Sequence, residues 1–332
     1  MTAATVPALT DAEFEREFEA LRSALLAHCY RMVGSYHDAE DLVQETYLRA
    51  RRGIGDFEGR SSVKTWLYRI ATNACLTALQ HHSRRFLPSG LGAPSGDPDA
   101  PVGTDSTVAW LEPLPDAALG RSGGDPAAEV VERDTVRLAL IVAFQHLAPR
   151  QRAALLLREV LGWPAAEIAA AMGIGVAAVK SLLQRARVRI AEVRADQEIA
   201  EPPDSARDRE LLDRWISAFE RADVRDLESL ISSDFSLEAA GHTTWFRGLA
   251  VCLPFLARRQ FRPAGQLRML PTRANGQPAA AGYLRQPDGS YRADHLTVLT
   301  IAGGKIIKVT NFLGERPVRD TGLPATMIGN RP

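Results

Sequence analysis

The sequence predicts a multidomain protein in which two all-α domains precede an α+β domain. Three observations support this fold class. Apolar residues recur at helical spacing over residues 12–85 and again over 127–198. A stretch rich in proline and glycine, residues 86–126, separates the two. After residue 205, one helical run precedes strand-like runs that are separated by turn signals, and 332 residues are enough for three domains.

The first domain, residues 12–85, is predicted to hold three helices. The first helix ends in a turn at Gly34, and the second begins near Asp38. Gly53 breaks the second helix, because glycine is a poor helix former. The serines at positions 61 and 62 offer a side-chain N-cap for the third helix.

Residues 86–126 are predicted to form an acidic, flexible linker. The segment holds seven prolines and seven glycines in 41 positions, too many for the interior of a helix or a strand. It carries one basic residue against six acidic ones.

The second helical domain, residues 127–198, is interrupted at Pro149, Pro164 and Gly173. The last interruption separates two helical runs in the layout of a helix-turn-helix. The third domain, residues 205–320, begins with a helix over 205–222. Asn-Gly, Asp-Gly and Gly-Gly turn signals then predict a meandering antiparallel sheet.

The cysteines Cys29, Cys75 and Cys252 are odd in number and far apart in the sequence, which favours neither a disulfide framework nor a metal site. No cofactor motif is found. No uninterrupted apolar run is long enough to span a bilayer, and the first twenty residues lack the pattern of a secretion signal. We therefore expect a cytoplasmic protein with no membrane partner.

The formal net charge of zero hides an alternating pattern of charge along the chain. The net charge is minus five over residues 11–50, plus five over 51–85, minus five over 86–126 and plus five over 147–195. Blocks of alternating sign indicate several different partner surfaces.

The helix after Gly173 contains "GVAAVKSLLQRARVR", residues 175–189, with four cations and no acid. A helical projection places five residues within one arc that faces a core: Val179, Leu182, Leu183, Ala186 and Ile190. The opposite side forms the cationic arc, which suits base edges and phosphates in a DNA groove: Ala177, Lys180, Ser181, Gln184, Arg185 and Arg187. A surface helix kept soluble by arginine is the alternative.

A second candidate nucleic-acid surface lies on the third helix of the first domain. An aromatic ring, a guanidinium and two amides share one side of this helix and form the amide stripe: Trp66, Arg69, Asn73 and Gln80. Such groups stack on unpaired bases and hydrogen-bond to them, so the stripe suits an opened DNA strand. Alternatively, Trp66 belongs to the core and the polar residues face water.

The second helix of the first domain presents carboxylates together with one apolar residue. This acidic face consists of Asp38, Asp41, Gln44, Glu45 and Leu48. Its charge is unsuited to DNA and suits a basic protein surface. The helix N-terminus by itself attracts acids, but this does not explain Glu45.

Three motifs together resemble an extracytoplasmic-function (ECF) sigma factor of the sigma-70 family, over about residues 13–195. They are "DAEDLVQETYLRA", "FEGRSSVKTWLYRIATNACL" and "LAPRQRAALLLREVLGWPAAEIAAAMGIGVAAVKSLLQRAR". The resemblance implies that the acidic face docks on the β′ clamp helices of core RNA polymerase. It also implies that the amide stripe opens the minus-ten promoter element, that the cationic arc enters the major groove at minus thirty-five, and that the β flap is a further partner. Ala178 and Leu182 depart from the usual threonine and arginine.

The third domain resembles a SnoaL-like domain, a cystatin-like α+β cone, and with it the chain is similar to the SigG-type subgroup. Such cones enclose a pocket. The candidate lining residues are Phe235, Trp245, Phe246, His295 and Phe312. Glu238, His242 or His295 would be the acid–base groups if this domain were an isomerase.

We interpret the sequence as a non-enzymatic promoter-specificity subunit whose third domain modulates its activity. An anti-sigma factor or a small ligand is a candidate further partner. Two alternatives stay open at this point. One is a stand-alone helix-turn-helix regulator with a ligand-sensing domain, and the other is a SnoaL-like enzyme with an appended DNA-binding module.

Overall fold

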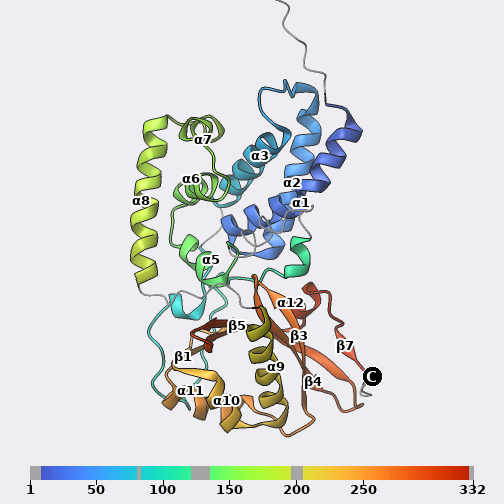
Figure 1. The fold of residues 1–332 in the computed structure, drawn as a ribbon, viewed down its shortest axis with the longest axis vertical. Helices are drawn as coiled ribbons and strands as arrows, with labels where there is room; N and C mark the ends of the chain where they lie inside the picture. Colours follow the sequence, from blue (N-terminus) through green and yellow to red (C-terminus); the bar gives the residue numbers. More distant parts are fainter. Residues whose placement is uncertain (1–8, 81–83, 121–134, 196–204, 329–332) are drawn as a thin grey trace, which may run out of the picture. The chain divides into compact units, whose positions relative to one another are not determined.

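The computed structural model of the protein describes residues 9–80, 84–120, 135–195 and 205–328 (Figure 1). The chain forms two compact units. The first gathers the described parts of Met1–Arg84, Leu119–Val136 and Leu140–Gln197. The second gathers those of Arg85–Ala118, Arg137–Ala139 and Glu198–Pro332.

The N-terminal part of the first unit holds three α-helices, as predicted. Thr10 opens the first helix with a capping box to Glu13, and Gly34 ends it in the left-handed conformation at φ 72°. Ser62 caps the third helix by accepting a hydrogen bond from the Thr65 amide at 3.1 Å. The elements are α1 (Asp11–Val33), α2 (Tyr36–Gly53), the 3₁₀ turn η1 (Ile54–Asp56) and α3 (Val63–Ala78).

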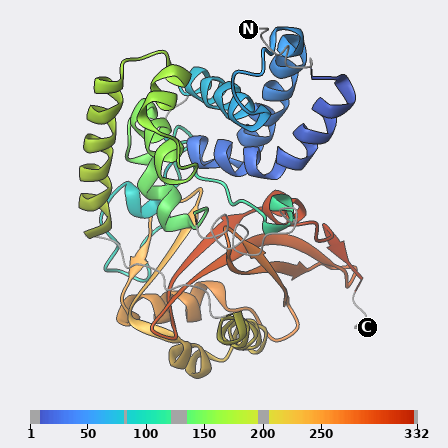
Figure 2. The same ribbon diagram turned by 45° about the horizontal axis from the view of Figure 1, so that its top comes forward.

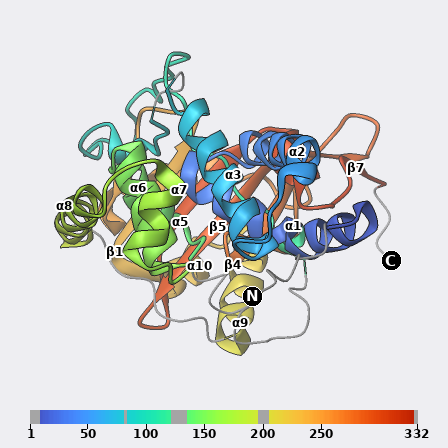
Figure 3. The same ribbon diagram turned by 90° about the horizontal axis from the view of Figure 1, so that it is seen from above.

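Further helices follow among residues 135–195, in the green part of the ribbon (Figure 3). Gly173 adopts the left-handed conformation at φ 63° and ends α7, so the predicted turn before the cationic helix is present. The helices α6, α7 and α8 pack on one another. Their bounds are α5 (Leu138–Gln145), α6 (Pro149–Glu159), α7 (Ala165–Met172) and α8 (Val176–Ala195).

The two helical parts pack together within the first unit, where α6 contacts α1 and α3. Arg152 of α6 is 2% exposed. Its guanidinium donates to the Met32 carbonyl oxygen of α1, to Gln145 Oε1 at 3.0 Å and to the Leu147 carbonyl oxygen at 3.2 Å. Burial lowers the pKa of Arg152 to about 10, so the guanidinium stays charged at neutral pH and is compensated by these acceptors.

No single helix among the described residues is both long and apolar enough to cross a membrane. One bent pair, Ala165–Met172 with Val176–Val193, meets those limits jointly, and its halves diverge by 103°.

The second unit is built on one curved sheet, with helices packed on one of its faces (Figure 2). The strand order is β2-β1-β6-β5-β4-β3, and β7 pairs with β5. The predicted turns at Asn275-Gly276, Asp288-Gly289 and Gly303-Gly304 connect consecutive antiparallel strands. They form the hairpins β3–β4, β4–β5 and β5–β6. The expectation of a wholly antiparallel sheet is wrong at one place, because β1 pairs with β6 in parallel.

The helices and strands of the second unit follow each other in the order of an α+β domain. They are α9 (Ser205–Arg221), α10 (Val224–Leu230), β1 (Ile231–Ala240), β2 (Phe246–Arg247), α11 (Leu249–Phe255), η4 (Leu256–Gln260), β3 (Leu267–Ala274), β4 (Gln277–Arg285), β5 (Tyr291–Ala302), β6 (Lys305–Leu313), α12 (Glu315–Asp320) and β7 (Thr326–Met327).

Residues 85–118 belong to the second unit and include the 3₁₀ turn η2 (Pro88–Gly90). The prediction of a flexible linker does not hold for this stretch. Leu87, Leu111 and Leu114 are buried, and the Leu114 backbone exchanges two hydrogen bonds with Asn275, at 2.7 and 3.0 Å. These leucines anchor a segment whose prolines and glycines prevent only regular secondary structure. Residues 121–126 lie outside the described part of the chain.

Candidate functional site

The cationic arc lies on the outer side of α8, as the helical projection predicts. All six of its side chains are exposed. Val179, Leu183 and Ala186 on the opposite side are buried, and Leu182 and Ile190 are half-buried. The first turn of α8 is therefore both accessible and lined with small residues, as entry into a DNA groove requires.

The cations of the arc differ in their surroundings. Among the described residues, Lys180 and Arg185 form no ion pair. Arg187 Nη2 lies 2.7 Å from Glu159 Oε1 of α6. An exposed pair of this kind contributes at most about 1 kcal/mol, so a phosphate could replace Glu159 at small cost. Lys180 and Arg185 need no such exchange.

The amide stripe is only partly accessible. Arg69, Asn73 and Gln80 are exposed, but Trp66 is 7% exposed and packs against Phe57, with ring centroids 5.0 Å apart. The expectation that this indole lies open for base stacking is wrong for this structure, because the helix edge that carries it closes an aromatic cluster with Phe57 and with α1.

Asn73 of the stripe is engaged by the second helical part. Its Nδ2 donates to the Ala171 carbonyl oxygen at the end of α7, at 3.3 Å. Asn73 is nevertheless exposed. For this amide to bind an unpaired base, only one weak hydrogen bond must therefore break.

The predicted acidic face lies on α2, where Asp38 and Glu45 are half-buried. Asp41, Gln44 and Leu48 are exposed, and Leu48 retains 49% of its accessible surface although it is apolar. Glu45 Oε1 accepts from Arg49 at 2.6 Å, which partly neutralises it. An exposed leucine beside carboxylates suits a partner with an apolar contact inside a basic rim.

A cavity of about 110 Å³ lies in the second unit, between the sheet and helices α9 and α11. Its wall is mainly apolar and aromatic, and four of its polar side chains come from β5 and β6: Asp294, His295, Thr297 and Asn311. Asp294 Oδ2 accepts from His295 Nδ1 at 2.9 Å, and this hydrogen bond lowers the pKa of the Asp294 carboxyl. Thr297 Oγ1 donates to Asn311 Oδ1 at 2.7 Å. The imidazole of His295 lies over Gly282, where any Cβ would overlap the ring.

Of the side chains predicted to line the pocket, Phe246 and His295 do so, and Phe235, Trp245 and Phe312 do not. Phe312 follows a cavity-lining residue on β6, and alternation turns it to the other face of the sheet. Phe235 is fully buried in the core beside Trp215. Trp245 donates its Nε1–H to the Gly92 carbonyl oxygen at 2.8 Å instead.

The predicted acid–base groups are placed unequally. The Glu238 carboxylate, 2% exposed, lies 2.5 Å from Lys308 Nζ and accepts from Thr310 Oγ1 at 3.2 Å and from the Ser89 amide at 3.0 Å. It is therefore committed to a structural ion pair. His242 lines the cavity, and burial lowers the pKa of its imidazole.

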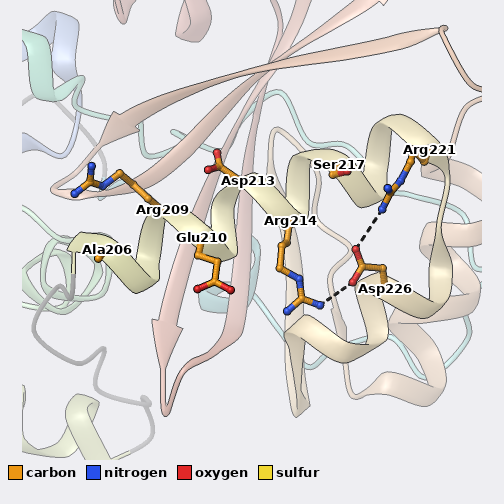
Figure 4. A pocket seen from close by; sticks show the side chains of 8 residues that line it. All are labelled: Ala206, Arg209, Glu210, Asp213, Arg214, Ser217, Arg221 and Asp226. Atoms are coloured by element: carbon orange, nitrogen blue, oxygen red, sulfur yellow. Dashed lines mark hydrogen bonds and ion pairs between the residues drawn. The ribbon is translucent and has the colours of Figure 1, made fainter.

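The outer side of α9 carries a second, open depression of about 620 Å³. Its side chains are mostly charged, and Arg214 and Arg221 both reach Asp226 of α10, at 2.7 and 3.5 Å (Figure 4). Asp226 pairs with both arginines, so these three charges are satisfied within the protein. The depression is a solvated helix surface.

Comparison with known proteins identifies the two helical parts. Residues 18–85 match sigma-70 region 2, and residues 137–190 match sigma-70 region 4. The ECF RNA polymerase sigma factor SigG of Mycobacterium tuberculosis (strain H37Rv) is 46% identical over 320 residues, which cover 95% of this chain and 85% of that protein. The SigJ sigma factor of the same strain is 29% identical over 93% of each chain.

A crystal structure of M. tuberculosis SigJ matches with a TM-score of 0.60 and 25% identity, over 93% of this chain and all of that one. Regions 2 and 4 define a sigma-70-type transcription factor. The chain belongs to the ECF sigma factors, and it is similar to SigG over nearly its whole length. The predicted family and the predicted order of two helical parts and an α+β cone are confirmed. Sigma factors bind core RNA polymerase and direct it to promoter DNA.

Proposed function

We propose that this sigma factor divides its contacts among three surfaces of its helical unit. The acidic face of α2 binds core polymerase at the β′ clamp helices, with the β flap as a further contact. The exposed part of the amide stripe, Arg69, Asn73 and Gln80, binds the melted minus-ten strand. The cationic arc of α8 binds duplex DNA at minus thirty-five.

The observation that carries this proposal is the separation of charge between two exposed helix faces. Asp41 lies on α2 and Lys180 on α8, both are exposed, and neither forms an ion pair among the described residues. Carboxylates repel phosphate and attract a basic protein, and the reverse holds for the cations. Each face therefore excludes the partner of the other.

We further infer that the third domain regulates the helical unit in the cytoplasm and is not an enzyme. Two features support this role. The sequence offered Glu238 as a catalytic carboxylate. This side chain is buried, and Lys308 neutralises its charge. The same domain also holds residues 85–118, which join the two sigma regions in sequence.

A crossed pair of charge variants tests the division of contacts. We expect Asp41→Lys to abolish binding to core polymerase while the full chain keeps its affinity for promoter duplex. We expect Lys180→Ala to do the opposite, and to lower the slope of log affinity against log salt by about one for one lost phosphate contact. The measurements are co-migration with core polymerase and fluorescence anisotropy of a labelled duplex at several salt concentrations.

Two matched variants serve as controls. Glu19→Lys makes the same charge change on the exposed side of α1, and Arg189→Ala removes a cation from α8 on the side opposite Lys180. Neither should change its respective binding by more than a small amount. If Asp41→Lys and Glu19→Lys weaken polymerase binding equally, the acidic face is not the docking surface.

A further inference from the structure

Residues 92–103 form a strap across the rim of the cavity in the second unit. Trp245 brackets one end of it, donating its Nε1–H to the Gly92 carbonyl oxygen at 2.8 Å and accepting from the Ser95 amide at 2.7 Å. At the other end, the Gly103 amide donates to Thr244 Oγ1 at 3.0 Å. These hydrogen bonds join residues far apart in the sequence, and each contributes about 1 kcal/mol.

The strap also supplies part of the cavity wall. Val102 lines the cavity and packs against the hydrophobic core of the domain. Its neighbour Gly103 lies tight against Thr243, and the Thr243 amide donates to the Gly103 carbonyl oxygen at 2.8 Å. Moving Val102 out of the cavity therefore requires these strap contacts to break.

Polar side chains line the cavity together with the apolar ones, and two of them, His295 and Asn311, offer an acceptor and a donor side by side. Asp294 Oδ2 accepts a hydrogen bond from His295 Nδ1–H, and in this tautomer the Nε2 atom of the ring is an acceptor. Asn311 Oδ1 is occupied by Thr297, which leaves Nδ2 as a donor. Among the described residues, neither His295 Nε2 nor Asn311 Nδ2 has a hydrogen-bond partner.

His295 and Asn311 are held in place and lie on adjacent strands. His295 is paired with Leu313 and Asn311 with Thr297, so the two are diagonal neighbours on the cavity face of the β5·β6 pair. Diagonal residues are about 7–8 Å apart at the backbone, within reach of one bridging atom between their side chains. A hydroxyl donates one hydrogen bond and accepts another, and it satisfies both groups without adding charge.

The volume of the cavity limits what enters while the strap is in place. A cavity of about 150 Å³ admits one benzene ring, whereas sites for larger small molecules measure about 300–1,000 Å³. The present volume of about 110 Å³ is below both limits. A ligand of two rings needs more space than this volume, and Val102 is the part of the wall that the strap contributes.

We propose that this cavity is a binding site for a neutral, largely apolar molecule with one hydroxyl group, and that a ligand larger than one ring binds only with release of the strap. Since the strap belongs to the segment between the two sigma regions, binding would free that segment. This consequence depends on the regulatory role proposed above. The binding itself does not, because it is measured on the full chain without polymerase or DNA.

Calorimetry with 2-naphthol and 2-methoxynaphthalene tests the site. The two probes share the ring system, but only the first donates a hydrogen bond. We expect 2-naphthol to bind about tenfold more tightly, and we expect Asn311→Leu or His295→Gln to remove most of that preference. Phe312→Leu, on the opposite face of β6, should preserve it. Failure of 2-naphthol to bind, or equal affinity of both probes for the parent chain, would overturn the proposed site.

Release of the strap has its own readout. Bound 2-naphthol should accelerate hydrogen exchange at the Ser95 and Gly103 amides, which donate to Trp245 and Thr244. Trp245→Phe removes one strap hydrogen bond without touching the cavity wall, and it should raise 2-naphthol affinity about fivefold because less must be broken. Binding with unchanged exchange at both amides, or with no gain in the variant, would show that the strap does not move.

Discussion

His28 should make the helical unit sensitive to mild acid. The side chain is 1% exposed in α1, and its Nε2 lies 2.9 Å from Thr72 Oγ1. Thr72 Oγ1 donates to the Tyr68 carbonyl oxygen, so His28 Nε2–H is the donor to Thr72. Burial, followed by the charge of nearby Arg31, lowers the pKa of His28 from 6.5 to about 3.

The sign and the size of the effect follow from linkage. The folded protein holds His28 neutral while the unfolded chain protonates it near pH 6.5, so stability is complete above that value and falls as the pH drops toward 3. Between pH 7 and pH 5 the loss in unfolding free energy is about 2 kcal/mol, because the unfolded state alone gains a proton in this range. This corresponds to roughly 4–8 °C in melting temperature for a unit of this size.

The assay is urea unfolding of the full chain, followed by circular dichroism at pH 7 and pH 5, for the parent and for His28→Gln. Glutamine keeps a neutral donor toward Thr72 but does not titrate. All other groups titrate in both proteins, so the difference between the two isolates His28. We expect the variant to lose about 2 kcal/mol less than the parent between the two pH values. Equal losses would refute the assignment of a buried neutral imidazole.

Two other predictions concern buried groups. Replacing Arg152 by Met should lower the unfolding free energy by about 2–4 kcal/mol in urea titrations, because two buried carbonyl oxygens lose their donor. A stability equal to that of the parent would show that these carbonyls find other donors. Cys75 and Cys252 should resist Ellman's reagent at pH 8 in the folded chain and react in urea, since burial raises the pKa of Cys252 to about 12, and a hydrogen bond with Cys29 followed by burial raises that of Cys75. Rapid reaction of all three thiols without urea would contradict their burial.

Local sequence was a sufficient guide wherever the deciding contacts are short in range. The helix ends at Gly34 and Gly173 follow from the freedom of glycine to adopt a positive φ, and the hairpin turns follow from the same property. The cationic arc was predictable because its inner and outer sides differ in polarity at every turn of α8. The burial of Trp66 was not predictable, because the projection of one helix does not show which neighbouring aromatic rings will cover this side chain.

Pocket residues were harder to predict than surfaces. Aromatic character suggested that Phe235, Trp245 and Phe312 line the pocket. Strand register and the strap place these side chains outside the cavity wall instead. Asn311 has no distinctive sequence signal and reaches the cavity only through its pairing with Thr297. The contact between Gly282 and His295 likewise cannot be read from the sequence, because only the pairing of β4 with β5 brings the two residues together.

The sequence by itself determined the family, the order of the domains, and the charged helix faces, because motifs, helical periodicity and charge are properties of neighbouring residues. Three outcomes were decided only by the tertiary structure. Cys29 and Cys75 form a hydrogen bond, Glu238 forms an ion pair with Lys308, and residues 85–118 belong to the same unit as the sheet. These outcomes depend on contacts between residues tens to more than a hundred positions apart. Such contacts form only when the burial of side chains like Leu114 outweighs the entropy of a free chain.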